Sequence, residues 1–113
     1  MSLDSSALLD LLLAARDILS FTQGMTLEKL QADELCRSAI LYKFAVIGEA
    51  VRRISAPFKE AHPQIPWVDM AGMRNRVIHE YHRVDVAEVW RTVQEDIPQL
   101  VCDLEPLAPR PAP

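Results

Sequence analysis

The segment from residue 33 to residue 55 constrains the fold most, because its apolar residues repeat three or four apart along two adjacent stripes. A helix that is apolar over more than half of its circumference needs partners on two sides, so we expect one partner in the chain and one in another subunit. Gly48 lies inside this helix at a propensity cost of roughly 1 kcal/mol, which predicts close packing of another backbone there. The stripe expected to be buried comprises Leu35, Ala39, Tyr42, Val46, Ala50 and Ile54, and the stripe beside it comprises Ile40, Phe44, Ile47 and Val51.

Similar periodicity elsewhere predicts an all-α fold. Short loops between helices favour antiparallel neighbours, so we expect an antiparallel four-helix-type bundle over residues 1–105 and a disordered Pro-rich tail over residues 106–113. Long helices are predicted over 5–21, 33–55, 67–81 and 86–104, with short helical turns over 26–31 and 58–62.

Two kinds of residue mark the ends and bends of these helices. Asp4 or Ser5 is expected to cap the first helix, and Asp85 the last, because their side-chain oxygens accept from free backbone N–H groups. Pro98 lies inside the last helix and predicts a kink.

Composition narrows the class of protein. With 113 residues the chain is one domain by length, and it has no run of 18 apolar residues and no basic leader, so we expect a cytoplasmic protein without membrane contact. Cys36 and Cys102 are too few and too far apart for a disulfide framework or a zinc site, and we expect both to be small core residues. The net charge of −4 argues against a general nucleic-acid coat, so any contact with RNA must be local.

Residues 73–82 read MRNRVIHEYH and concentrate the polar chemistry of the chain. On a continuous helix, Arg76 and Glu80 would form a solvated ion pair on one side. An Arg-rich helix with a histidine is ordinarily such a solvated face. The opposite arc, of roughly 160°, adjoins the side more suited to packing. It would carry Tyr81, Arg74, Ile78, His82, Asn75 and His79.

This set of side chains is suited to cutting RNA without a metal or other cofactor. A neutral imidazole, here His79, can take the proton of a ribose 2′-hydroxyl, and the freed oxygen then attacks the adjacent phosphorus. The planar guanidinium of Arg74 can stabilise the charge on the phosphoryl oxygens. Asn75 could orient the imidazole or contact the phosphate. Because Arg74 and His79 are about 140° apart around one straight helix, we expect two copies to build a shared groove in a homodimer.

The segment resembles the Arg-x4-His-x-Tyr motif of the HEPN superfamily, in particular of HepT-like ribonuclease toxins. Three further stretches are similar to that family and extend the resemblance over roughly residues 5 to 104. They are AVIGEAVRRIS at 45–55, IPWVDMAGMRNRVIHEY at 65–81 and VDVAEVWRTVQEDIPQL at 84–100.

The resemblance implies an all-helical homodimer that acts as a metal-independent endoribonuclease, the toxic half of a type II/VII-like bacterial toxin–antitoxin pair. It implies a minimal nucleotidyltransferase as the antitoxin, which attaches AMP to the motif tyrosine. Carried over by position, Arg74 and His79 are the catalytic pair, Asn75 supports them, and Tyr81 is the site of AMPylation.

Other residues and other functions remain open from the sequence. His82, Arg52 and Arg53 are possible RNA contacts, and Glu49 could face the active groove, a partner or neither. A non-catalytic nucleotide- or substrate-binding subunit of a nucleotidyltransferase is the main alternative to a nuclease. A purely structural dimerisation subunit is a third interpretation.

Overall fold

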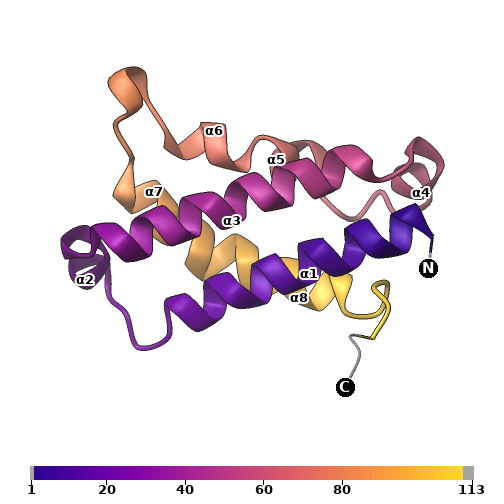
Figure 1. Ribbon diagram of the computed structural model, residues 1–113, viewed down its shortest axis with the longest axis horizontal. Helices are drawn as coiled ribbons and strands as arrows, with labels where there is room; N and C mark the ends of the chain where they lie inside the picture. The colour runs from indigo at the N-terminus through magenta and orange to yellow at the C-terminus, as the bar shows by residue number, and fades with distance from the viewer. Residues whose placement is uncertain (1, 111–113) are drawn as a thin grey trace.

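Two long helices, α1 (Leu3–Phe21) and α3 (Glu34–Arg53), lie side by side in the computed structural model, which describes residues 2–110. They run in opposite directions and are joined through the short α2 (Leu27–Ala32) (Figure 1). The helix α1 starts two residues earlier than predicted, and its cap is Ser2, whose side chain accepts from the N–H of Ser5. The expected cap, Asp4 or Ser5, is therefore wrong. Asp4 instead accepts hydrogen bonds from the N–H and hydroxyl of Ser55, which tie the start of α1 to the residues after α3.

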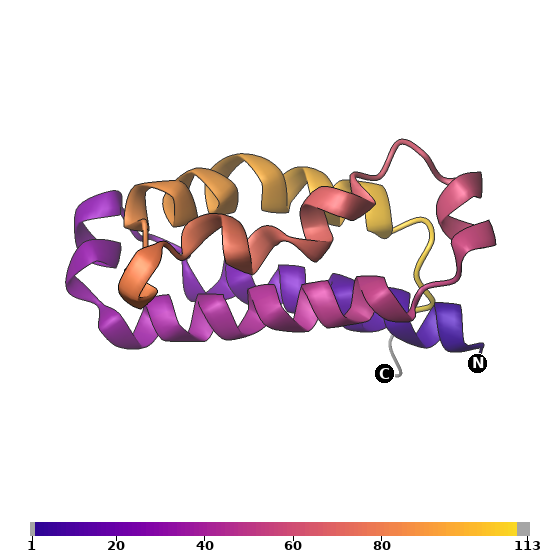
Figure 2. The ribbon, with the colours of Figure 1, turned by 90° about the horizontal axis from the view of Figure 1, so that it is seen from above.

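The rest of the chain forms a second layer across this pair. Viewed from above, α1 and α3 lie in one layer and the later helices lie in the other (Figure 2). The helix α8 packs on α1, while α5 and α6 pack on α3. The all-α prediction is confirmed. The later elements are α4 (Ala56–Ala61), α5 (Trp67–Ala71), α6 (Met73–Val77), the 3-10 turn η1 (Glu80–His82), α7 (Val86–Arg91), the π-helical segment η2 (Thr92–Asp96) and α8 (Ile97–Leu104).

The core lies between the two layers, and α3 contributes its second predicted stripe to it. The four members of that stripe are fully or almost fully buried, namely Ile40, Phe44, Ile47 and Val51. The prediction that the first stripe is buried holds for Ala50 and Ile54 but is wrong for Leu35 and Tyr42, whose exposed fractions are 84% and 65%. The helix therefore leaves an apolar strip on the surface of the chain.

The predicted helix over 67–81 is wrong, because the structure breaks it twice. Gly72 separates α5 from α6, and α6 ends at Val77. Buried side chains recur at helical spacing as far as Val77, and the backbone is extended at Ile78 and His79, with φ of −109° and −102°. Val77 and Ile78 are β-branched residues in succession. Such residues favour an extended backbone, which is the local reason that the helix stops there.

The predicted helix over 86–104 exists as three segments in one run, α7, η2 and α8. Asp85 caps α7 as expected, accepting from the N–H of Glu88 at 3.0 Å. The irregularity expected at Pro98 takes the form of the π-helical segment that precedes it. Proline has no N–H to donate to the carbonyl four residues earlier, and a wider turn accommodates that loss.

The two cysteines differ in exposure, and part of the predicted tail packs against the core. Cys36 is half-buried, and this burial raises the pKa of its thiol, but Cys102 is exposed, so its assignment to the core is wrong. Within the predicted tail, Leu107 and Ala108 pack against the core, and residues 111–113 lie outside the described residues. No helix in the described part of the chain is long and apolar enough to cross a membrane.

Candidate active site

A short antiparallel neck follows α6 and holds a loop that projects from the helical layers (Figure 1). Ile78 and Val84 form an isolated β-bridge across it. On one side of this bridge the N–H of His79 donates to the carbonyl of Arg83, and on the other the N–H of Asp85 donates to the carbonyl of Val77, each at 2.7 Å. Three adjacent residue pairs therefore close the loop and set its register.

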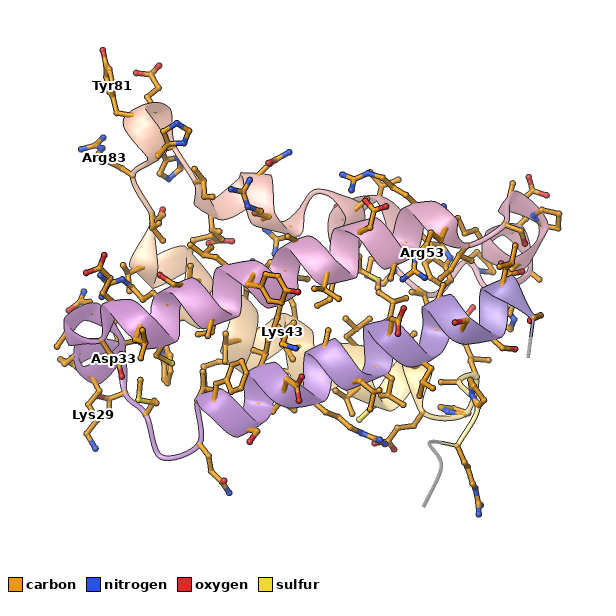
Figure 3. The ribbon with its side chains drawn as sticks, in the orientation of Figure 1. Lys29, Asp33, Lys43, Arg53, Tyr81 and Arg83 are labelled. Carbon is orange, nitrogen blue, oxygen red and sulfur yellow. The ribbon has the colours of Figure 1, made fainter. Side chains whose placement is uncertain are left out.

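The tip of the loop carries the predicted modification site. Tyr81 and His82 both adopt a left-handed backbone, with φ of 60° and 59°, which L residues rarely do. The Tyr81 side chain is 93% exposed and points away from the helices (Figure 3). The single helical face predicted for Arg74, His79 and Tyr81 is thus wrong, and so is the expected packing side for Tyr81. The 140° separation between Arg74 and His79 on one helix no longer applies either.

His79 lies on the neck, in the residue pair next to the loop, and its side chain contacts a carboxylate. Its Nε2 is 3.2 Å from Oδ2 of Asp85, while Oδ1 of the same carboxylate accepts from the N–H of Glu88. The backbone bond from Glu88, followed by the side-chain bond to His79, lowers the pKa of Asp85 below its usual value. Sequence reasoning identified Asp85 only as a helix cap. Its contact with the imidazole depends on the neck, which the predicted helix over 67–81 excluded.

Arg74 and Asn75 line a groove of about 290 Å³ between α3 and the α5–α6 segment. The prediction of close packing at Gly48 is confirmed at its floor, because a Cβ atom there would lie 3.0 Å from the carbonyl oxygen of Ala71. The full lining comprises Phe44, Ala45, Gly48, Glu49, Arg52, Ala71, Arg74 and Asn75. The polar residues of this lining come from two separate parts of the sequence, and they are Glu49, Arg52, Arg74 and Asn75.

The charges around the groove leave one arginine available. Arg74 forms no salt bridge within residues 2–110, whereas Arg52 lies 3.6 Å from Glu49 on the same helix. Arg53 pairs instead with Asp10 of α1 at 2.7 Å and does not line the groove (Figure 3). An exposed guanidinium without a carboxylate partner in a groove is suited to an anion.

Arg76 serves a different purpose from the predicted one. It does not lie on a solvated face with Glu80, because its guanidinium bonds to Asp96 at 3.0 Å and to the hydroxyl of buried Thr92 at 3.2 Å. Hydrogen bonds from Arg91 lower the pKa of Glu88, which also lies 3.5 Å from Arg76. This network ties α6 to α7 and η2, so Arg76 holds α6 in place.

The structure thus separates the predicted residues into two neighbouring groups. Arg74, Asn75, Arg52 and Glu49 line the groove, while His79 lies on the neck that follows α6 and Tyr81 lies at its tip. No three His, Cys, Asp or Glu side chains gather as metal ligands anywhere between residues 2 and 110.

Comparison with known proteins identifies the family. A relative from Thermococcus cleftensis named "Probable ribonuclease HepT" is 42% identical over 87 residues, which cover 77% of this chain and 79% of the relative. A relative from Methanocaldococcus jannaschii named "Putative RNase MJ1380" is 35% identical over 98 residues, covering 87% of this chain and 90% of the relative. No solved structure matches the chain significantly. Residues 11–106 match the family model described as "Ribonuclease HepT-like", and the chain belongs to this HepT-like family of the HEPN superfamily.

Proposed function

We propose that this protein is a metal-independent endoribonuclease that acts in the cytoplasm as the toxin of a bacterial toxin–antitoxin pair. The observation that supports this is the placement of the Arg74 guanidinium in a groove, without a salt bridge to any residue between 2 and 110, with the His79 imidazole bonded to a carboxylate on the neck that follows the same helix. Membership in a ribonuclease family gives RNA as the substrate class.

The proposed reaction needs one base and one cation. His79 removes the proton of a ribose 2′-hydroxyl, the freed oxygen forms a bond to the adjacent phosphorus, and the bond from phosphorus to the 5′-oxygen breaks. The imidazolium then returns its proton to the departing oxygen. Arg74 stabilises the negative charge that gathers on the phosphoryl oxygens, and Asn75 beside it donates to the same phosphate.

Local charge makes this compatible with an acidic chain. The net charge of −4 does not favour RNA over the whole surface, so contact is confined to the groove and the loop. Arg52 in the groove and His82 at the tip are the further contacts that we propose. Arg53 is a weaker candidate than Arg52 because it already forms a salt bridge with Asp10.

We propose a minimal nucleotidyltransferase as the antitoxin, which silences the enzyme by AMPylation of Tyr81. The phenol gives up its proton to a base of the nucleotidyltransferase, and its oxygen forms a bond to the α-phosphorus of ATP. The bond from that phosphorus to the oxygen that bridges the α- and β-phosphates breaks, and pyrophosphate leaves. The exposure of Tyr81 at the loop tip supports this, because a second enzyme must reach the hydroxyl. The added phosphate places negative charge and bulk beside the RNA path, where it repels the substrate.

We also propose that the protein, built as a four-helix-type bundle, acts as a homodimer through the exposed face of α3. Six exposed residues lie within an arc of about 100° on that helix, namely Leu35, Ser38, Tyr42, Ala45, Glu49 and Arg52. The last three also line the groove with Arg74. A second copy on this strip would therefore border the groove and provide the second partner that the apolar circumference of α3 requires.

Cleavage of a labelled RNA in the presence of EDTA tests the catalytic assignment. Wild-type protein should cleave it, and Arg74→Ala and His79→Ala should each lower kcat by on the order of 10²-fold or more, the usual contribution of a general base or a charge-stabilising group. Both side chains are exposed, so the circular dichroism spectrum should not change.

Matched variants separate chemistry from general damage. Arg16→Ala removes an exposed arginine of α1, and His62→Gln removes an imidazole at the end of α4, outside the groove and the neck. Both variants should cleave like wild type. Activity that survives in both site variants rejects the assignment. Equal inactivity of wild type and variants on every RNA tried favours the non-catalytic binding subunit, and activity that returns only with added metal rejects the metal-free mechanism.

A further inference from the structure

We propose that Asp85 is the positioning residue for His79 and that it makes Nδ1 the ring nitrogen that takes the proton from RNA. This inference rests on the proposed function for its catalytic meaning. The underlying claim, that one side chain selects the tautomer of the imidazole, concerns the protein alone and is measured without RNA.

The register of the neck brings the two side chains together. Residues directly opposite each other across the neck share a face, so His79 and Arg83 do, and Asp85, two residues beyond Arg83, lies on that face as well. The backbone pairs are 77 with 85 and 79 with 83, so His79 and Asp85 are diagonal neighbours across the neck. Diagonal neighbours are within reach of long side chains, and the 3.2 Å contact from Nε2 to Oδ2 is of this kind.

The position of Asp85 is fixed from the other direction by α7. Its Oδ1 accepts from the N–H of Glu88 at 3.0 Å, the capping bond of that helix, and its own N–H donates to Val77. The carboxylate therefore has one oxygen committed to the helix and one facing His79. Because both its backbone and one oxygen are held, Asp85 presents the second oxygen at a set place.

The protonation state of Asp85 decides which ring nitrogen carries hydrogen. The capping bond and the His79 contact keep its pKa below the usual value, so the group is ionised at neutral pH and only accepts hydrogen bonds. The Nε2 that faces it must then be the N–H of the neutral ring, and the lone pair lies on Nδ1. Nδ1 forms no hydrogen bond within residues 2–110, so it is available as the base.

The same contact helps after proton transfer. Once Nδ1 accepts the proton from the 2′-hydroxyl, the ring becomes a cation with Nε2–H still directed at the carboxylate. The ion pair stabilises that cation and keeps the ring in place for the return of the proton. The role considered for Asn75, orientation of the imidazole, thus falls to a residue ten positions later, and Asn75 is left to the phosphate.

The substitution Asp85→Asn isolates this role because asparagine caps a helix about as well as aspartate does. Its amide oxygen can accept from Glu88, which leaves the NH₂ group facing His79. That group donates, so Nε2 must become an acceptor and the hydrogen must move to Nδ1. Asp33 offers the matched control: it caps α3 by accepting from Cys36 and lies outside the neck and the groove (Figure 3).

Nitrogen-15 spectra of the histidine side chains at neutral pH give the decisive readout, since protonated and unprotonated ring nitrogens differ widely in chemical shift. The chain has three histidines, and His79→Gln identifies which signals belong to residue 79. We expect the Nε2–H tautomer in wild type and in Asp33→Asn, and the Nδ1–H tautomer in Asp85→Asn. An Nδ1–H ring in wild type, or an unchanged tautomer in Asp85→Asn, overturns the proposal.

Kinetics on RNA then connect the tautomer with catalysis. Asp85→Asn should lower kcat by on the order of 10²- to 10⁴-fold, the range seen when the orienting acid of a catalytic histidine becomes an amide, with KM for RNA nearly unchanged. Asp33→Asn should retain wild-type kcat. If wild type cleaves and Asp85→Asn cleaves equally well, the positioning role is rejected while the proposed function stands. If wild type itself does not cleave, the proposed function fails and the spectra still decide the tautomer.

Discussion

Tyr81 and His82 hold a backbone conformation that costs roughly 1–2 kcal/mol for each L residue. The three paired positions of the neck hold both ends of the three-residue loop, Glu80–His82, and this closure accounts for the persistence of two left-handed residues in succession. The result is a tyrosine ring held clear of the protein surface. A side chain presented in this way is suited to being a substrate of another enzyme rather than a part of the protein's own core.

Substitution of this tyrosine gives a prediction at the residue scale. Incubation of the protein with ATP and the proposed nucleotidyltransferase should add mass in units of AMP, and Tyr81→Phe should not gain this mass because it lacks the nucleophilic oxygen. Intact-protein mass spectrometry measures the addition. Tyr42→Phe is the matched control, since that tyrosine is also exposed, and it should be modified like wild type. Mass gained equally by Tyr81→Phe would place the target elsewhere.

At the scale of elements, the contact between α3 and α5 shapes the groove. Gly48 and Ala71 both line it, and the absence of a side chain at residue 48 allows the carbonyl of Ala71 to approach α3. Arg74 follows Ala71 by three residues, at the start of α6. The position of the guanidinium therefore depends on how closely these two helices pack.

Gly48→Ala should destabilise the protein although alanine is the better helix former. The gain in helix propensity is about 1 kcal/mol, while forcing a methyl group against a backbone carbonyl costs about 1–3 kcal/mol. We expect a net loss of about 1 kcal/mol in the free energy of unfolding, measured by urea denaturation, together with weaker RNA cleavage. Gly72→Ala is the control, because its Cβ atom would lie 3.7 Å from the carbonyl of Val68, an ordinary contact, and its stability should not fall. A more stable Gly48→Ala protein would contradict the packing argument.

The elements also indicate how far the sequence predicts this structure. Helical periodicity located α1, α3 and the α7–α8 run to within about two residues, because buried apolar stripes extend over each of them. It failed after Val77, where charged residues continue at helical spacing but the buried ones do not. The candidate residues Arg74 and His79 came from residue types and spacing. The contact of His79 with Asp85 could not be predicted in this way, because it depends on the pairing of residues 77–79 with residues 83–85, which no local pattern indicates.

For the molecule as a whole, the exposed strip on α3 is the feature that a single copy leaves unexplained. Leu35 and Tyr42 are large apolar residues that lie mostly in solvent on the longest helix. Large apolar side chains exposed on one helix face suit an interface. A dimer formed there would also bring two grooves near one another, since Ala45 and Arg52 belong to both strip and groove.

Tyr42→Arg should therefore convert the proposed dimer into a monomer and reduce cleavage of RNA. Two copies of a new arginine would face each other across a symmetric contact, where like charges and lost apolar burial both oppose association. Size-exclusion chromatography with light scattering gives the mass. Leu3→Arg changes an equally apolar, exposed residue at the start of α1 and should remain dimeric. If wild type elutes as a monomer at micromolar concentrations, the strip is not a homodimer contact.

The neck imposes different tolerances on neighbouring residues. Residues inserted at the tip, between Glu80 and His82, leave the 77–85 and 79–83 pairings intact, because the extra chain enlarges only the loop. A single residue inserted between Arg83 and Asp85 shifts alternation by one and turns the carboxylate to the opposite face. Within seven consecutive residues, then, the tip tolerates a change in length, and the segment that brings Asp85 to His79 does not.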